Sequence, residues 1–407
     1  MERTILHCDL NNFFASVEIH DNPSLADYPV AVCGSTELRS GIVLAKNMKA
    51  KEMGVVTAEA IWQAKQKCPD LVTVPPRFDR YMEFSRAARK IYDRYSYAVE
   101  PFGIDEAWLD MSGCERLFGS PEEIALKLKE DIKSELGITA SVGASFNKVF
   151  AKLGSDLKKP DAVTIISKEN FKEKIYGLPA SDMLGIGKAT ANKLSRFYIN
   201  TIGDVANANP EFLKKLLGIN GEMIWKNANG LDSSPVMQSG FAPPVKSVGN
   251  SSTAIHDLTS AEEINRLFLS LAISVSQRLR KLELEAMSIQ IFVKTSDFVS
   301  RDFQKPLPFP TRSSRILQSE ASKLFFENFR SDFSVRAIGI RAIKLVPFGQ
   351  GQLSLFEDEK RLEKLEALES CTDKIRERCG KFSVRPASLL KCDFNKEDFC
   401  SLPQAAH

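Results

Sequence analysis

The spacing of apolar and polar positions changes between two periods along the chain. Residues 3–8 form a short apolar run of the kind that makes a strand, whereas residues 121–136 repeat apolar positions at helical spacing behind Ser120, a typical N-cap. The same patterns recur as a strand at 139–143 and as helices at 78–97 and 146–157. We therefore expect strands and helices to alternate in the first part of the chain.

Beyond residue 166 the pattern becomes helical. Within residues 184–194, Gly185 and Gly187 precede a helical run that begins near Lys188. Glycines permit a tight turn, and backbone N–H groups at the start of the following helix can face a phosphate. The segment therefore has the form of a helix–hairpin–helix, which favours contact with a nucleic-acid backbone.

A segment rich in Pro, Gly and Ser at 232–244 predicts a linker. Beyond it we expect strands at 247–255, 286–295 and 335–345 and helices at 260–282 and 314–329. Two helices over one sheet make a separate α+β domain. In the tail we expect helices at 359–369 and 372–379 and an extended piece at 382–390.

Candidate chemistry centres on residues 103–110, where Asp105 and Glu106 interrupt apolar positions that otherwise predict a buried strand after a turn. Two adjacent carboxylates resist burial unless a cation neutralises them. A third carboxylate, Asp9, ends the first strand. If the two strands are neighbours, the three carboxylates converge as oxygen ligands of the kind that Mg²⁺ takes in phosphoryl transfer.

Three segments in this order are similar to those of one protein family. Residues 8–18 read CDLNNFFASVE, residues 103–110 read GIDEAWLD and residues 141–148 read SVGASFNK. They closely resemble the bacterial Y-family (DinB/UmuC-like) translesion DNA polymerases, and the resemblance covers about residues 1–345. It implies a low-fidelity, template-directed polymerase that transfers nucleotides from dNTP to a primer 3′-hydroxyl on primer-template DNA.

The resemblance also implies the fold class, an α+β multidomain protein with right-hand polymerase architecture. Its expected parts are a palm at 1–18 and 78–166, fingers at 19–77, a thumb at 167–232, a linker at 233–244, a little finger at 245–345 and a tail at 346–407.

Residue roles follow from the same resemblance. Asp9, Asp105, Glu106 and the Leu10 carbonyl would hold two Mg²⁺ ions, and Phe14 would be the steric gate against ribonucleotides. The other residues matched to nucleotide contacts are Phe13, Met48, Lys51 and Lys159. Many family members carry Tyr-x-x-Arg where this chain has Met48 and Lys51, so one hydroxyl and a guanidinium fork are missing.

Further residues match the family's binding surfaces. Those matched to the roof over the nascent base pair are Ile42, Leu44, Thr57 and Ala58. Those matched to DNA contacts are Gly185, Gly187, Lys188, Arg336 and Arg341. A peptide of the type that docks on the bacterial sliding clamp is formed by Gln352, Leu353, Ser354, Leu355 and Phe356.

Composition limits the remaining possibilities. The formal net charge is only +3, so attraction to nucleic acid must come from local patches. No run of eighteen apolar residues predicts a membrane span, and we expect a cytoplasmic monomer. The eight cysteines include no CxxC pair, which favours reduced thiols over a zinc site.

Two alternatives share part of this pattern. A palm-fold nucleotide cyclase would use a carboxylate-bearing sheet but needs neither a helix–hairpin–helix nor a clamp peptide. A catalytically weak, polymerase-like adaptor in mutagenic repair would keep the DNA and clamp contacts while losing metal ligands. Asp9, Asp105 and Glu106 argue against such a loss, whereas Met48 and Lys51 leave room for it.

Overall fold

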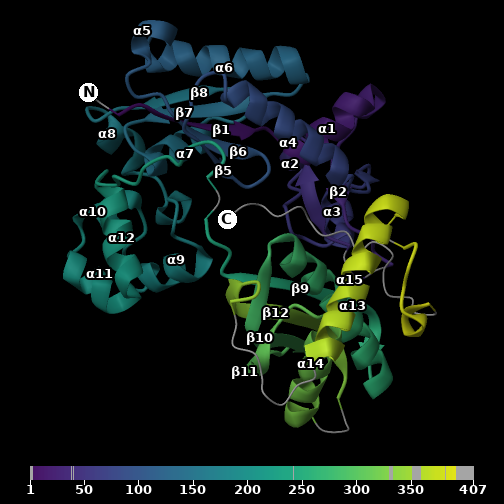
Figure 1. Cartoon of the computed structure of the whole chain (residues 1–407). Helices are drawn as coiled ribbons and strands as arrows, with labels where there is room; N and C mark the ends of the chain where they lie inside the picture. Colours follow the sequence, from purple (N-terminus) through teal and green to yellow (C-terminus); the bar gives the residue numbers. More distant parts are fainter. Residues whose placement is uncertain are drawn as a thin grey trace. The chain divides into compact units, whose positions relative to one another are not determined.

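The computed structural model (Figure 1) describes residues 3–37, 39, 41–241, 243–329, 333–350, 359–380 and 382–390. These residues fall into two compact units, one from residues before 34 together with 43–243, the other from 34–42 together with residues from 244 onward. Each unit is described separately below.

A five-stranded sheet with β1 at its centre organises the first unit. The strand order is β5-β6-β1-β7-β8, and β1 runs antiparallel to both of its neighbours. The strands are β1 (Ile5–Leu10), β5 (Val99–Phe102), β6 (Glu106–Asp110), β7 (Ala140–Ser145) and β8 (Val163–Ile166). The hairpin expected around residue 103 is confirmed as β5–β6, and the expected adjacency of the two carboxylate-bearing strands is confirmed as β1–β6.

Helices cover both faces of this sheet (Figure 1). On one face, Leu6 and Cys8 pack in a core shared with α4 (Phe78–Tyr92) and α6 (Pro121–Leu136). On the other face, α7 (Lys148–Leu157) lies across β1 and β7. The side chain of Ser120 caps α6 as predicted. Helix α4 ends five residues earlier than predicted because the Ser96 hydroxyl bonds to Ala98 and Asp110 carbonyls and turns the chain into β5.

Residues 13–33 and 43–77 of the first unit form a smaller layer with its own sheet, ordered β3-β2-β4. Its core combines Ala31, Ala50 and Ala64 with larger side chains such as Val43 and Leu71. The elements of this segment are α1 (Phe13–Asp21), η1 (Pro23–Asp27), β2 (Val30–Cys33), β3 (Val43–Lys46), α2 (Met48–Glu52), α3 (Ile61–Lys67) and β4 (Val72–Val74). The short helix α5 (Glu115–Phe118) precedes α6.

Short helices make up residues 167–232, as the pattern predicted. They are α8 (Phe171–Ile175), η2 (Ala180–Asp182), α9 (Lys188–Ser195), α10 (Ile202–Asn207), α11 (Pro210–Leu217) and α12 (Ile219–Ala228). Their core includes Phe150 and Leu153 of α7. The segment that follows them lies against the five-stranded sheet, since Val236 packs with Ile5 and Trp108, and the Met237 amide donates to Glu100 Oε2 at 2.9 Å.

The second unit is an antiparallel sheet ordered β11-β10-β12-β9 with a core shared by two helices. Its elements are β9 (Ser247–Leu258), α13 (Ala261–Lys281), β10 (Leu284–Thr295), β11 (Ser300–Thr311), α14 (Ser314–Asn328) and β12 (Val335–Pro347). The sequence pattern missed β11, which contains Pro306, Pro308 and Pro310. An edge strand tolerates proline because half of its N–H groups need no partner strand.

The tail departs from its predicted form. Residues 359–379 make one helix, α15 (Glu359–Cys379), instead of two, and residues 382–390 contain a 3₁₀ turn, η3 (Ala387–Leu389), instead of an extended piece. The expected clamp peptide at 352–356 lies outside the described residues. No helix in the described part of the chain is long and apolar enough to cross a membrane.

Candidate active site

Three carboxylates meet at one end of the five-stranded sheet. Asp9 on β1 is the direct ladder partner of Glu106 on β6, and Asp105 lies in the turn immediately before β6. The Leu10 amide donates to the Asp105 carbonyl at 3.0 Å, which fixes that turn to β1. The structure therefore brings together the four residues that the sequence suggested as metal ligands.

Burial has the largest effect on the pKa of two of these carboxyl groups, those of Asp9 and Asp105. It raises the pKa of Asp9 to about 7 and that of Asp105 to about 6, and the nearby charge of Glu106 acts in the same direction. Burial also acts to raise the pKa of Glu106, but its contacts with His7 and Lys152 outweigh that effect and lower this pKa to about 2. Cations placed beside Asp9 and Asp105 would therefore favour the ionised forms of these carboxyl groups.

Two lysines on and after α7 neutralise part of this charge. Lys159 Nζ lies 2.7 Å from Asp9 Oδ2, and Lys152 Nζ lies 2.5 Å from Glu106 Oε2. Asp156 contacts both ammonium groups, at 2.8 Å from Lys159 and 3.5 Å from Lys152. Lys159 was expected at the site, whereas Lys152 and Asp156 were missed, although their positions one turn apart on a helix beside Lys159 could have indicated them.

His7 is a further residue that sequence reasoning missed. It is fully buried two positions before Asp9 on β1, so both side chains leave the same face of the sheet. Its Nδ1 lies 2.8 Å from Ser155 Oγ on α7, and its Nε2 lies 3.2 Å from Glu106 Oε2. Burial lowers the pKa of His7 to about 4, so the ring is neutral at physiological pH.

The donor set fits hard divalent cations, because three carboxylates and a backbone carbonyl offer only oxygen ligands. Lys159 forms an ion pair with Asp9, and Lys152 forms one with Glu106. Within the described residues, no three Asp, Glu, His or Cys side chains lie close enough together to hold a metal ion. The residues present are therefore of the right type for Mg²⁺, and two of them are held by lysines in this structure.

The aromatic residues after β1 are packed against α4. Phe14 stacks on Tyr81 with ring centroids 4.3 Å apart and meets Phe78 edge-on at 5.9 Å. Phe13 is buried beside it. Phe14 itself is only half-buried, so one side of the ring is held by packing and part of it remains accessible.

The residues matched to the fingers lie on α2 and around β3. Met48 begins α2, and Lys51 lies exposed one turn later. Leu44 is on β3, and the chain at Thr57 and Ala58 is joined to that strand because the Ala58 amide donates to the Val43 carbonyl at 2.8 Å. The fourth residue expected in the roof, Ile42, is exposed and belongs to the second compact unit.

Residues matched to DNA contacts lie in two places. Gly185 has φ +95°, a left-handed conformation that favours glycine, and Gly187 is the N-cap of α9, whose first residue is the exposed Lys188. Arg336 and Arg341 are on β12. The Arg336 guanidinium lies over the Phe298 ring at 4.8 Å.

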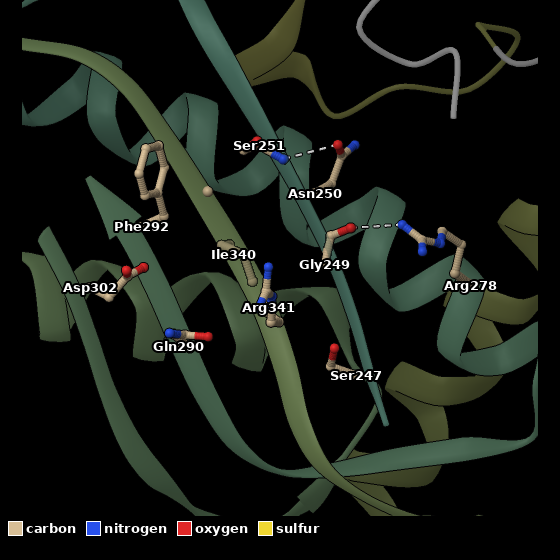
Figure 2. A pocket seen from close by; sticks show the side chains of 11 residues that line it. Ser247, Gly249, Asn250, Ser251, Arg278, Gln290, Phe292, Asp302, Ile340 and Arg341 are labelled. Carbon is tan, nitrogen blue, oxygen red and sulfur yellow. Dashed lines mark hydrogen bonds between the residues drawn. The ribbon is translucent and has the colours of Figure 1, made fainter. Parts of the chain in front are cut away.

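Arg341 lines a cavity of about 680 Å³ in the second unit (Figure 2). Along β10 and β12, Ile291 and Ile340 are buried, so the alternate residues Gln290 and Arg341 leave the opposite face of the sheet. Gly249 is paired with Arg341 in the ladder, and its carbonyl accepts a bond from Arg278 at 2.8 Å. The sequence pattern did not predict this hollow, which depends on glycine opposite a long side chain.

Comparisons with known proteins decide the family. Residues 8–156 match the model of the impB/mucB/samB family, and residues 245–355 match the model of the C-terminal domain of that family. The chain is 48% identical over 392 residues to a DNA polymerase IV of Acetivibrio thermocellus, with 96% of this chain and 98% of the relative covered. The chain belongs to the Y-family of DNA polymerases.

Other Y-family proteins are also similar over most of the chain. The chain is 38% identical over 400 residues to DNA polymerase IV 1 of Bacillus subtilis, with 97% of this chain and 95% of the relative covered. The fold is similar to a solved Y-family DNA polymerase chimera of Dbh and Dpo4, with a TM-score of 0.75, 25% identity and coverage of 84% of this chain and 99% of the chimera. The right-hand polymerase fold is thereby confirmed.

Membership of the Y-family decides between the functional alternatives. The nucleotide cyclase is excluded, since both family models and full-length relatives are those of DNA polymerases. Nothing in the comparisons favours the weak adaptor. Like the relatives it matches, this Y-family chain is a DNA-directed DNA polymerase.

Proposed function

We propose that this chain carries out translesion DNA synthesis by transferring nucleotides from dNTP to a primer 3′-hydroxyl at the Asp9, Asp105 and Glu106 site. One observation carries the proposal: Asp9 and Glu106 are direct ladder partners, with Asp105 beside them and Lys159 Nζ 2.7 Å from Asp9. Neighbouring carboxylates next to a lysine suit an anionic triphosphate and the cations that accompany it.

In this proposal Asp9, Asp105, Glu106 and the Leu10 carbonyl hold two Mg²⁺ ions. When bound, such ions lower the barrier for the 3′-hydroxyl and neutralise charge on the phosphates. The chain's own residues position these ligands: the β1–β6 ladder sets the spacing between Asp9 and Glu106, and the Leu10–Asp105 backbone bond orients the turn. Lys152 and Asp156 keep the remaining charge balanced.

Nucleotide selection is assigned to the residues beside the site. The Phe14 ring, held by Tyr81, lies against the deoxyribose and leaves no room for a 2′-hydroxyl, while Lys159 contacts the triphosphate. Lys51 adds positive charge without a guanidinium fork, and Met48 offers no hydroxyl. Nucleotide binding through the fingers is therefore weak, and Lys159 carries a larger share of it.

DNA contacts are assigned to both units. We place the palm at 1–18 and 78–166, the fingers at 19–77, the thumb at 167–232 and the little finger at 245–345. In the thumb, Gly185, Gly187 and Lys188 present backbone N–H groups and charge to a phosphate. In the little finger, Arg336 and Arg341 on β12 contact the duplex backbone. These contacts are independent of sequence, as extension on any template requires.

The sliding clamp is the proposed protein partner. Gln352 to Phe356, outside the described residues, carries Leu353, Leu355 and Phe356 for an apolar pocket and Gln352 for its polar edge. We propose that the enzyme is a monomer that depends on this contact for processivity.

The test is primer extension by the Asp105→Ala variant. Removing one carboxylate should lower the extension rate by at least about 10³-fold, because electrostatic stabilisation of the reacting phosphate is lost. Primer-template binding, measured by fluorescence anisotropy, should stay unchanged. Asp70→Ala, at an exposed position, is the control. Appreciable extension by Asp105→Ala would contradict the assignment, and DNA binding without extension by the wild type would favour the adaptor.

A further inference from the structure

One side chain ties the turn that carries Lys159 to the strands of the active site. Asn11 Oδ1 accepts a bond from the Asp161 amide at 2.8 Å, and Asn11 Nδ2 donates to Ser141 Oγ at 2.8 Å. Asn11 is only 3% exposed, and its own amide donates to the Thr139 carbonyl at 2.9 Å. The side chain is therefore fully enclosed and bridges β7 and the turn.

Asp161 is the point at which the turn is fixed. Its φ is +54°, a left-handed conformation that aspartate tolerates better than most residues. From the α6 side, Lys129 Nζ donates to its carbonyl at 3.0 Å, and Lys133 Nζ lies 3.2 Å from its carboxylate. From the active-site side, Asn11 is the side chain that binds its amide. Asn11 thus holds the face of the turn that is nearest the carboxylates.

Lys159 lies two residues before this fixed point. Its Nζ reaches Asp9 and Asp156, so the ammonium is held at the edge of the carboxylate cluster. Asn11 lies two residues after Asp9 in the same short segment. A movement of the turn away from Asn11 would therefore separate Lys159 from the place where Asp9 and the phosphates of a nucleotide meet.

We propose that Asn11 is a positioning residue for nucleotide binding, which acts through Lys159 by holding residues 158–161 against β1 and β7. The inference rests on the proposed function, because it takes a dNTP triphosphate as the ligand of Lys159. The position of Lys159 matters in this chain because Met48 and Lys51, in the proposed fingers, supply neither a tyrosine hydroxyl nor a guanidinium group. Lys159, and hence the turn that holds it, therefore makes a larger share of the contact with the triphosphate.

The test measures dNTP binding at equilibrium rather than turnover. The protein is mixed with a dideoxy-terminated primer-template and Ca²⁺, and the dissociation constant of the template-matched dNTP is measured, with the dissociation constant of the DNA as a second readout. Asn11→Ala should weaken dNTP binding about tenfold, the effect of losing hydrogen bonds that position a charged group, and leave DNA binding unchanged.

Two variants separate positioning from general loss of structure. Asn11→Asp keeps an oxygen for the Asp161 amide and can accept the Ser141 hydroxyl hydrogen, so it should bind dNTP more tightly than Asn11→Ala. Ser141→Ala removes only the bond that orients Asn11 and should weaken binding about threefold. Asn170→Ala is the matched control, since Asn170 Oδ1 also accepts one backbone amide, that of Ser167, at 2.9 Å.

A double variant tests whether Asn11→Ala weakens dNTP binding by changing the position of Lys159. If it does, Asn11→Ala combined with Lys159→Ala should bind dNTP no more weakly than Lys159→Ala alone. A further loss in the double variant, or normal dNTP binding by Asn11→Ala, would overturn the inference while the polymerase assignment stood. A wild-type protein that did not prefer the template-matched dNTP would overturn the proposed function, and the inference with it.

Discussion

Asp105 shows how a residue proposed to hold a metal ion can weaken the fold around it. The side chain lies partly buried in the turn before β6, and burial together with the charge of Glu106 raises its pKa to about 6 from its usual value of 3.8. The folded protein therefore favours the neutral form. Stability from this group is fully present below the unfolded pKa and is lost as pH rises through about 6.

Asp105→Asn should remove this pH dependence from the metal-free protein. At pH 8, with a chelator present, the variant should be more stable than the wild type by about 2 kcal/mol, and the difference should vanish near pH 4. Chemical denaturation followed by circular dichroism at both pH values measures it. Asp70→Asn, at an exposed position, provides the control. An Asp105→Asn protein that was less stable than the wild type at pH 8 would contradict the buried-charge explanation.

Phe14 offers a second test at this scale. Its ring is fixed by stacking on Tyr81, so Phe14→Ala should leave space where the 2′-hydroxyl of a ribonucleotide would lie. The preference for dNTP over rNTP, as the ratio of kcat/KM values, should fall at least about 10²-fold, since a lost steric clash is worth several kcal/mol. Phe13→Leu, at the buried neighbouring position, is the control. Unchanged discrimination in Phe14→Ala would place the gate elsewhere.

Some of the site residues could be predicted from the sequence, and others could not. Asp9, Asp105 and Glu106 were predicted because carboxylates within apolar strands are conspicuous and because neighbouring strands bring them together. His7 gave no such signal, since its contacts with Ser155 and Glu106 form only once α7 lies across β1. A contact such as that of His7 with Ser155, which lies 148 residues later, depends on the tertiary fold, which local patterns do not encode.

At the scale of single elements, α15 makes contacts that the sequence pattern did not predict. The sequence pattern predicted helices at 359–369 and 372–379 but no packing partner for them, whereas in the structure Glu369 accepts bonds from the Ser314 amide and hydroxyl at the first turn of α14. Arg280 of α13 contacts Glu369 at 2.6 Å and Asp373 at 2.6 Å and is only 9% exposed. The Ser313 side chain makes no cap bond to α14, so a distant glutamate takes that role.

Arg280→Ala should therefore loosen two helices together. Removing one member of a buried ion pair leaves its partners uncompensated, at a cost of about 3 kcal/mol. Hydrogen–deuterium exchange should become about 100-fold faster in α15 and in the first turn of α14. The matched control is Lys281→Ala, whose pair with Glu377 is exposed and contributes below about 1 kcal/mol. Equal exchange in the two variants would show that the Arg280 cluster does not hold α15.

For the whole molecule, the proposed clamp contact bears on how long the polymerase stays on DNA. The net charge is +3, and the proposed DNA contacts are spread over two units. A tether to the clamp raises the local concentration of DNA without strengthening the polymerase's own contacts. The chain's short helices in the thumb and its small fingers are consistent with an enzyme that relies on such a tether.

Replacing Leu355 and Phe356 together by Ala should remove the apolar anchors of the clamp peptide. Extension length in a single binding event should then no longer increase when clamp is added, while extension without clamp stays at the wild-type value. Replacing Asp358 by Ala, just beyond the peptide, serves as a control. Equal clamp stimulation of the double variant and the wild type would show that these residues are not the docking peptide.

The position of α15 in the chain limits which variants can test the proposed clamp peptide. The proposed clamp peptide precedes the glutamate that caps α14, so a stop codon placed before the peptide would delete both. A shortened protein of this kind would expose Arg280 and uncap a helix of the second unit. Loss of clamp dependence in that protein could then arise from a damaged domain as readily as from a missing peptide. Point substitutions, or an internal replacement that leaves residues 359–379 in place, distinguish the effect of a missing peptide from that of a damaged domain.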